Sequence, residues 1–174
     1  MPLLPIRLFG DPVLRQRAAE VTEFDDDLRR LAQDMLLTLQ SAAGAAIAAN
    51  QVGVLQRVFV WELGEDRGAL VNPTVIDTSE EAQDGEEGCL SFPGLYFPTV
   101  RPLRARLQGV DVHGEPREEH GEGVRARMLL HELDHLNGIL FIDHLARHDR
   151  KEAMRRIRAG ELEHPPAISD SPVV

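Results

Sequence analysis

Residues 124–138 read VRARMLLHELDHLNG. No helix breaker precedes Leu136 in this stretch, which favours a buried helix, and the Asn-Gly pair at its end would supply a left-handed C-cap. Because residues four apart stack on one face of a helix, about 6 Å from each other, His131 and His135 would both reach one metal ion. Glu132 would lean over the open coordination position. The pattern therefore predicts a metal-activated water whose proton a carboxylate accepts.

An alternative interpretation makes the two histidines ordinary core residues, with Glu132 in a solvated ion pair. Burying two imidazoles and a carboxylate among Met128 and the neighbouring leucines is costly without a strong partner, so metal binding is the favoured interpretation. Two histidines do not hold a catalytic metal, and the third ligand decides the class of enzyme.

Neither common zinc-protease pattern supplies the third ligand. In proteases that extend the motif with a glycine and a third histidine, that histidine would stand at position 141, which is Phe141 here. In the thermolysin-like class a glutamate follows the second histidine by about 20 residues, where this chain has Arg155. Glu152 and Glu161 remain conceivable ligands at other spacings.

Cys89, the single cysteine, lies in the segment Glu-Gly-Cys-Leu-Ser at residues 87–91. A thiolate is a good ligand for iron(II), zinc, cobalt or nickel, and a turn between a glycine and a strand-like segment presents it well. Taken alone, a lone cysteine is more often a small buried hydrophobe. A single cysteine also excludes an internal disulfide.

Residues 44–53, GAAIAANQVG, carry small side chains that permit close backbone approach to a ligand. Gln51 in this stretch offers an amide that can donate a hydrogen bond to a developing oxyanion. Taken alone, such a stretch at a helix end usually reflects tight packing.

Together and in this order, the three segments resemble the peptide deformylase family. The family pattern is a Gly-x-Gly-x-Ala-Ala-x-Gln turn, a Glu-Gly-Cys-Leu-Ser strand and a His-Glu-x-x-His helix, and the resemblance runs from Asp11-Pro12-Val13-Leu14 to Leu140-Phe141-Ile142-Asp143. Three residues depart from the pattern: Ala46 replaces the second glycine, Leu130 a common polar residue and His144 a common arginine. None of the three is a predicted ligand or the acid/base, so activity should survive them.

The resemblance implies an enzyme that hydrolyses the N-terminal formyl group of formylmethionyl nascent peptides and releases formate. It implies one divalent metal ion, Fe(II) in the native enzyme, with Zn, Ni or Co as replacements. Such an ion lowers the pKa of water toward neutrality, and Glu132 would take the proton and return it to the leaving amine. Gln51 and the backbone N–H of Leu90 would receive the charge that develops on the formyl oxygen. The implied metal ligands are Cys89, His131 and His135.

The resemblance also implies which residues surround the substrate. Ala45 and Gly88 would pair with the substrate backbone as a strand does, and an apolar pocket for methionine would lie beside the metal helix. Glu87 and Arg101 would form a supporting buried pair. The implied substrate-binding residues are Gly44, Ala45, Ala46, Gly88, Val124 and Met128.

Two interpretations from other classes of function remain open. A zinc metalloprotease using Glu152 or Glu161 would cleave internal peptide bonds and would not need Cys89. The second is a catalytically inert binding module on the same fold, against which the intact Gln51, Cys89 and Glu132 argue. Formate release from a formylated peptide distinguishes the three functions.

The remaining pattern predicts an α+β domain, with antiparallel or mixed sheets around the metal-binding helix and further helices near both ends. Acidic residues 25–27 open a first helix whose apolar stripe repeats every three or four residues, with Gly44 as its stop. Strands are expected at 54–61, at 69–76 and from Leu103, and a phase shift at Gly109 suggests a bulge there.

The C-terminal third is expected to contain further turns and one more helix. His113-Gly114 would form a hairpin turn before a polar segment that ends at Gly123, and a last helix is expected at about 149–159. Residues 1–160 would form a single catalytic domain. Residues 161–174 contain three prolines and no apolar period, so we expect a disordered tail.

Composition narrows the partners and the location. The chain has 174 residues, of which 43% are hydrophobic, enough for the core of one domain. Its net charge of −10 disfavours direct DNA binding, and no apolar run approaches the roughly 18 residues needed to cross a membrane. The N-terminus lacks the pattern of a secretory or transit signal, so a cytoplasmic location is expected.

The last helix departs from the acidic balance of the chain. Residues 147–158 contain six basic and two acidic residues, a local charge of +4. Such segregation suits a polyanionic partner, and some deformylases, which the chain resembles, use their C-terminal helix to contact the ribosome. The simpler interpretation, a solvated helix whose arginines pair with acidic residues of the same protein, is favoured over ribosome contact.

Overall fold

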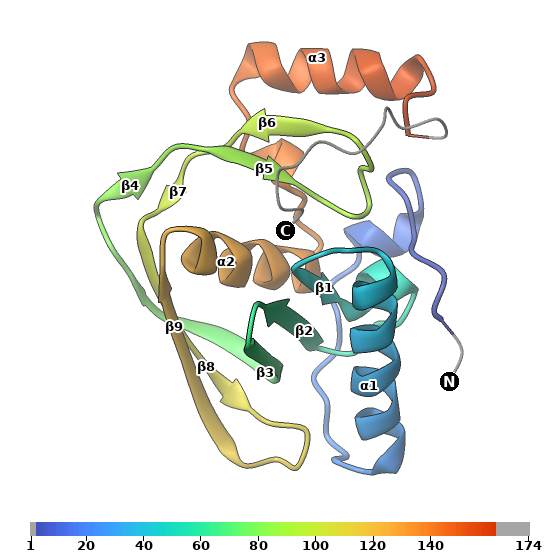
Figure 1. Cartoon of the computed structure of the whole chain (residues 1–174), viewed down its shortest axis with the longest axis vertical. Helices are drawn as coiled ribbons and strands as arrows, with labels where there is room; N and C mark the ends of the chain where they lie inside the picture. The colour runs from blue at the N-terminus through green and yellow to red at the C-terminus, as the bar shows by residue number, and fades with distance from the viewer. Residues whose placement is uncertain (1–2, 163–174) are drawn as a thin grey trace.

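The computed structural model describes residues 3–162 as an α+β fold of one five-stranded sheet, two small sheets and three α-helices (Figure 1). The predicted fold class is therefore confirmed. The five-stranded sheet has the order β1-β2-β3-β8-β9, and its neighbouring strands are antiparallel. Its strands are β1 (Ala46–Ala48), β2 (Val58–Leu63), β3 (Asp66–Thr78), β8 (Arg104–Val110) and β9 (Pro116–Glu122).

The remaining elements are short strands and helices. The two-stranded sheets pair β4 (Ala82–Gln83) with β7 (Arg101–Pro102) and β5 (Glu86–Gly88) with β6 (Tyr96–Pro98). The α-helices are α1 (Asp26–Ser41), α2 (Val124–Leu136) and α3 (Arg147–Arg158). Three short 3₁₀ helices are η1 (Pro12–Arg15), η2 (Ala49–Val52) and η3 (Phe141–Asp143).

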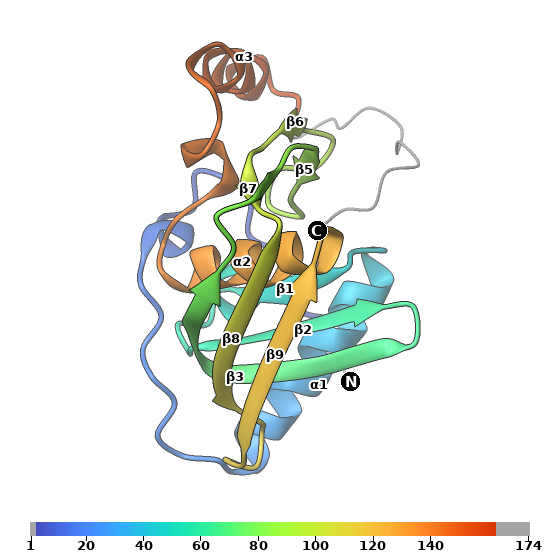
Figure 2. The ribbon, with the colours of Figure 1, turned by 90° about the vertical axis from the view of Figure 1, so that its left-hand side faces the viewer.

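The two faces of the large sheet bury different helices, because successive residues of a strand point to opposite faces. Val58 and Val60 of β2 belong to the core cluster that contains the apolar stripe of α1. Their neighbours Phe59 and Trp61 belong to the cluster that contains α2. Helices α1 and α2 therefore lie to either side of β1 and β2 in Figure 1, and β8 and β9 run across α2 in Figure 2.

Helix α2 begins and ends at the predicted residues. At its C-terminus the N–H of Gly138 donates to the carbonyl of His135, and the N–H of Ile139 donates to the carbonyl of Asp134, so the last turn is capped by a Schellman motif. Gly138 has a φ of +73°, and a Cβ there would lie 2.6 Å from the carbonyl oxygen of Arg15. Only glycine fits at this position, directly after the C-cap residue Asn137.

The end of α1 differs from the prediction. Asp25 caps its N-terminus by accepting hydrogen bonds from the N–H groups of Asp27 and Leu28, as the acidic residues indicated. However, the helix ends at Ser41, and Ala43 rather than Gly44 takes the left-handed conformation, with a φ of +52°. Gly44 is needed for space instead, since a Cβ there would lie 2.8 Å from the side chains of Leu39 and Leu90.

Several strands also differ from their predicted positions. The stretch of small residues after α1 contains β1, which was not predicted, because alanine does not favour strands. The predicted strand at 54–61 begins only at Val58, and the one at 69–76 is part of the longer β3. The polar segment before Gly123 is β9, the outermost strand of the sheet, and the prediction missed it because an exposed edge strand can be almost entirely polar.

The predicted bulge lies on the partner strand rather than at Gly109. Val71 pairs with Val110 and Thr74 pairs with Gln108. Between these two pairs β3 advances by three residues while β8 advances by two, so the extra residue lies in β3. Gly109 faces this irregularity, and a Cβ on it would lie 2.5 Å from the carbonyl oxygen of Val71. The phase shift in β8 was therefore a sign of close backbone approach by a bulge opposite.

At the C-terminus, α3 covers two residues more at its start than the predicted helix. Of the predicted disordered tail, only residues 161 and 162 lie within the described part, and both are in a turn; the others lie outside the described residues. Within residues 3–162, no helix has the length and apolar character needed to cross a membrane.

Candidate metal centre

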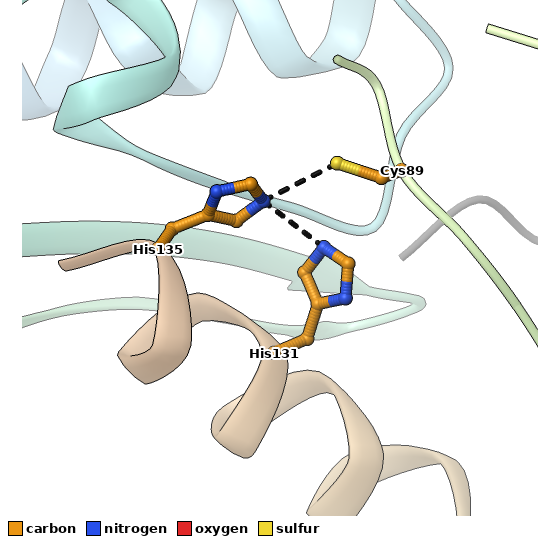
Figure 3. A group of neighbouring side chains, drawn as sticks. All are labelled: Cys89, His131 and His135. Carbon is orange, nitrogen blue, oxygen red and sulfur yellow. Dashed lines mark hydrogen bonds between the residues drawn. The ribbon is translucent and has the colours of Figure 1, made fainter. Parts of the chain in front are cut away.

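The structure brings the three predicted metal ligands together. His131 and His135 project from one face of α2, and Cys89 faces them from the turn after β5 (Figure 3). Nε2 of His135 lies 3.2 Å from Nε2 of His131 and 3.2 Å from Sγ of Cys89. These distances are close to the roughly 3.3–3.6 Å edges of a tetrahedron whose bonds to nitrogen and sulfur are about 2.0–2.3 Å long. The donor set therefore fits one divalent cation.

Cys89 is held in place by its own turn and by a neighbouring strand. The N–H of Phe92 donates to the carbonyl of Cys89 and closes the turn. The N–H of Ser91 donates to Sγ at 3.4 Å. Gly88, just before the cysteine, must lack a side chain, because a Cβ there would lie 2.5 Å from the ring of Tyr96 on β6. Tight pairing of β5 with β6 thus aims the thiol at α2.

Glu87 fixes the orientation of His131. Nδ1 of His131 lies 2.6 Å from Oε1 of Glu87, and a carboxylate can only accept, so Nδ1 carries the hydrogen. The lone pair on Nε2 of His131 then points toward His135 and Cys89, the orientation that metal binding needs.

The carboxylate of Glu87 is fully buried between two arginines. Arg101 donates to it through Nε at 3.0 Å and Nη2 at 2.6 Å, and Arg127 donates through Nη1 at 2.8 Å. Burial alone would raise the pKa of Glu87, but the hydrogen bonds from His131 and Arg101 hold this pKa well below its ordinary value. The pair of Glu87 with Arg101, expected from the sequence, is present as a buried ion pair.

Three further residues of this network were not predicted: Arg127, Asp134 and His144. Arg127 lies four residues before His131 on α2 and therefore on the same face, a signal that the sequence offered. Asp134 accepts from Nη1 of Arg101 at 2.6 Å and lies 2.7 Å from Nε2 of His144. These contacts depend on β7 and η3 meeting α2, which no local pattern indicates.

Glu132 lies in the same core, next to the ligands. It is fully buried, and neither of its carboxylate oxygens has a hydrogen-bond partner among residues 3–162. Burial raises the pKa of Glu132, and the nearby charges of Glu87 and Asp134 raise it further. A carboxyl group that is buried without a partner and strongly shifted is typical of a site that handles protons.

The ligands themselves are also shifted by burial. Burial, and then the neighbouring His131, lower the pKa of His135, which keeps its imidazole in the neutral form that binds a cation. Burial raises the pKa of the Cys89 thiol. A cation at this position would stabilise the thiolate.

The two glutamates considered as alternative ligands lie elsewhere. Among the described residues, Cys89, His131 and His135 form the group of potential ligands close enough to share one ion. Glu152 instead pairs with Arg155 on the surface of α3, and Glu161 pairs with Arg156. The zinc-protease ligand set is therefore not assembled.

Comparison with known proteins agrees with this geometry. The polypeptide deformylase family matches residues 3–151. A peptide deformylase of Acidothermus cellulolyticus is 52% identical over 161 residues, which are 92% of this chain and 89% of that protein. The chain belongs to the peptide deformylase family. It is an enzyme, a hydrolase that removes the formyl group from the N-terminus of nascent polypeptides, and the family is metal-dependent.

Solved structures of deformylases support the same assignment. The crystal structure of peptide deformylase from Thermus thermophilus has a TM-score of 0.86 and 42% identity, covering 93% of this chain and 96% of that one. A peptide deformylase from Legionella pneumophila has a TM-score of 0.87 and 35% identity, covering 94% of this chain and 98% of that one. The protease and the inert binding module are not favoured by these likenesses.

Gln51, the predicted oxyanion donor of the deformylase site, is oriented by its neighbours. It lies in η2 and is 1% exposed. Its Oε1 accepts from the N–H of Ala48 at 2.9 Å, so the amide can only present Nε2 to the site. Nε2 lies 3.2 Å from Oγ of Ser91 and 3.5 Å from Sγ of Cys89. The predicted donor therefore points at Ser91 and at the ligand Cys89.

The predicted substrate residues fall in two places. Gly44 lies against the side chain of Leu90, so the segment 44–46 adjoins the turn that carries Cys89. The predicted strand-like partners Ala45 and Gly88 are buried there, as is Ala46. Their contact with substrate stays a prediction.

The other two predicted substrate residues are Val124 and Met128, both on α2. Val124 is 52% exposed at the start of the helix, whereas Met128 is fully buried in the cluster that contains Phe59 and Trp61. The position of Met128 favours a packing role, and a methionine pocket at these residues stays a prediction.

Proposed function

We propose that Cys89, His131 and His135 hold one divalent cation, and that the enzyme hydrolyses the formyl amide of formylmethionyl peptides beside it. The observation that supports this most directly is the convergence of three buried donors next to Glu132. When bound, a divalent cation supplies Lewis-acid chemistry, since it polarises a carbonyl group and makes water acidic near neutral pH.

Glu132 is proposed as the catalytic acid/base. It accepts the proton of the attacking water and then donates it to the amine that leaves when the C–N bond of the formyl amide breaks. Its two oxygens are free of other partners within the described part of the chain, so they are available to a water molecule and to the leaving nitrogen in turn. The products are formate and a free N-terminus.

Gln51 and the backbone N–H of Leu90 are proposed as the donors that stabilise the developing oxyanion. Gln51 Nε2 is held beside Cys89 because its Oε1 is engaged by Ala48. Donors that are fixed before the reaction need no reorganisation when charge appears on the formyl oxygen. The fit is made for a formyl group, so an acetyl methyl would displace the carbonyl from these donors.

The substrate backbone is proposed to pair with Ala45 and with Gly88, beside Gly44 and Ala46, which would place the formyl group at the ligands. The methionine side chain would lie beside α2, near Val124 and Met128. Acetylmethionyl peptides should therefore react poorly compared with formylmethionyl peptides. Equal rates on the two substrates would contradict the proposed position of Gln51.

We infer that Fe(II) is the native metal, with Zn, Ni and Co as replacements. One thiolate and two imidazoles suit each of these ions, and iron(II) is the ion that the family resemblance implies. Purification without oxygen, followed by metal analysis and a formate-release assay on the same sample, tests both the ion and the activity. Peroxide should inactivate the iron form faster than the nickel or cobalt form, because iron promotes oxidation of the thiolate.

Ribosome contact through α3 is proposed as a second property of the enzyme. Of its six cations, Arg150, Arg155 and Arg156 pair with acidic residues of this chain. The other three, Arg147, Lys151 and Arg158, are exposed and lie within about 40° of one another around the helix axis at 100° per residue. A stripe of cations with that spacing suits a phosphate backbone.

Co-sedimentation with ribosomes tests this contact. Changing Arg147, Lys151 and Arg158 to Glu should abolish pelleting at low salt and leave activity on free peptides unchanged. The matched control changes Arg150, Arg155 and Arg156, whose charges are already engaged within the chain, and should have a smaller effect. Equal pelleting of the first variant and the wild type would refute the contact. Such a role also accords with the proposed cytoplasmic location, where nascent chains emerge.

A further inference from the structure

A chain of hydrogen-bonded side chains runs from the ligand His131 to the protein surface. His131 donates to Glu87, and Arg101 holds Glu87 with Nε and Nη2. The third nitrogen of the guanidinium, Nη1, donates to Oδ2 of Asp134 at 2.6 Å. Nε2 of His144 lies 2.7 Å from the same oxygen. His144 is the outermost member, with 36% of its side chain exposed.

His144 must be a donor in this chain of contacts. The carboxylate of Asp134 only accepts, so the distance of 2.7 Å requires a hydrogen on Nε2 of His144. Arg101 only donates, so its Nη1 at 3.4 Å from the same nitrogen makes no hydrogen bond. Oδ2 of Asp134 therefore receives two donors, one from the core and one from the surface.

The two donors to Asp134, Arg101 and His144, differ in how deeply they are buried. Within residues 3–162, Arg101 and His144 are the side chains that donate to Asp134. Arg101 is buried, with 4% of its side chain exposed, whereas 17% of the Asp134 side chain is exposed. Without His144, the Asp134 carboxylate is free to turn toward water, while Arg101 stays buried beside Glu87 with Nη1 unpaired. An unpaired buried cationic donor is costly. The Arg101 guanidinium would therefore shift to find another acceptor for Nη1, and this shift would weaken its hydrogen bonds to Glu87.

We propose that His144 is a positioning residue for the metal centre. It fixes Asp134, Asp134 orients Arg101, and Arg101 holds Glu87 against Nδ1 of His131. The inference rests on the proposed metal centre, because the property that it affects is how firmly His131 binds a cation. Partners behind a metal-binding histidine typically change metal affinity by about 10–100-fold when they are lost, and His144 acts through two further residues, so its effect should be smaller.

The rate at which the cobalt-loaded enzyme releases its ion to a chelator measures this role without reference to catalysis. His144→Phe keeps a planar ring and removes the donor, and should release cobalt about threefold to tenfold faster than the wild type. His144→Gln places an amide N–H near the position of Nε2 and should restore release to within about twofold of the wild type. His113→Phe, at an exposed histidine in the turn between β8 and β9, is the matched control and should release cobalt at the wild-type rate.

A double-mutant cycle with Asp134→Asn distinguishes positioning from simple damage to the surface. If His144 acts through Asp134, His144→Phe should have no further effect on cobalt release in the Asp134→Asn background. An equal acceleration in both backgrounds, or release at the wild-type rate by His144→Phe, or no restoration by His144→Gln, would overturn the proposal. Failure of the wild type to hold cobalt would refute the metal centre itself, together with the role of His144.

Discussion

Helices α2 and α3 are similar in length, 13 and 12 residues, and both carry several charges, yet they place these charges in opposite surroundings. Helix α2 is buried on almost every face, including Arg127, His131, Glu132 and His135. Helix α3 buries only Ala153 and exposes all of its arginines except the partly buried Arg156. A charge that is buried must find a partner or be neutralised, whereas an exposed ion pair contributes little. Charge is therefore informative about chemistry only where the helix face is also known.

The largest effect should come from removing the thiol that completes the donor set of α2. Cys89→Ala leaves two imidazoles, which do not hold a catalytic metal, so we expect loss of the bound metal and of formate release. Glu152→Ala, which changes an exposed carboxylate of α3, should keep both. Metal content of the two purified variants, measured against the wild type, decides between them. If the Cys89→Ala protein still contained metal, Cys89 would not be the third ligand.

Glu132→Gln should have the next largest effect. The amide has nearly the same shape as the buried carboxyl group but cannot accept a proton from water, so formate release should fall by roughly 10²–10⁴-fold while metal is retained. Glu152→Gln on α3 is the matched control and should retain full activity. Activity of Glu132→Gln within a few-fold of the wild type would remove this residue from proton transfer.

The contrast between the two helices also explains what could be predicted from the sequence. The proposed metal ligands, Glu132 and Gln51 could be picked out of the sequence because their spacing is local or their order along the chain is distinctive. Helix α2 was predicted with its C-terminal cap because apolar residues and Asn137-Gly138 act within one segment. The strand β9 was missed because its residues are almost all polar at the edge of the sheet, where exposure removes the alternation that identifies a strand.

Residues that act through tertiary contacts were not predicted. The sequence indicated the pair of Glu87 and Arg101 only through the family resemblance. For Arg127 it offered only the four-residue spacing from His131, which places the two on one helix face and does not identify Glu87 as the shared partner. Asp134 lies inside the metal motif, but its partners Arg101 and His144 come from β7 and from the end of η3. Such contacts depend on how elements meet, which no periodicity within one element specifies.

Arg127 and Arg158 allow the effect of burial on stability to be measured, because one is a buried arginine of α2 and the other an exposed arginine of α3. Arg127→Leu removes one of two cations that neutralise the buried Glu87, and breaking such a pair costs about 3 kcal/mol or more in the free energy of unfolding. Arg158→Leu, at an exposed position of α3, should change it by less than about 0.5 kcal/mol. Denaturant unfolding of the two variants measures the difference. If the two variants had equal free energies of unfolding, burial would not make the Arg127 ion pair more important for stability than an exposed arginine of α3.

The smallest effect should come from Asp143 of η3, in the segment of chain that connects α2 to α3. Its carboxylate accepts from Arg15 at 2.5 Å and lies 3.4 Å from Arg150 of α3. Burial acts to raise the pKa of Asp143, but the hydrogen bonds from Arg15 and from the N–H of Leu140 outweigh it and lower this pKa below its ordinary value. A carboxylate with a lowered pKa stabilises the folded state above its unfolded-state pKa and loses this contribution as pH falls through the folded-state value.

Asp143→Asn should therefore lower the free energy of unfolding near pH 7 by no more than about 1 kcal/mol, since the pair is partly exposed. The difference between the variant and the wild type should begin to shrink below about pH 4, where the unfolded-state carboxyl takes up its proton, and should vanish once the pH has fallen through the lower folded-state pKa of Asp143. A difference that stayed constant down to pH 2 would mean that Asp143 contributes through packing or the Leu140 hydrogen bond, and that charge plays no part in its contacts with Arg15 and with Arg150 of α3.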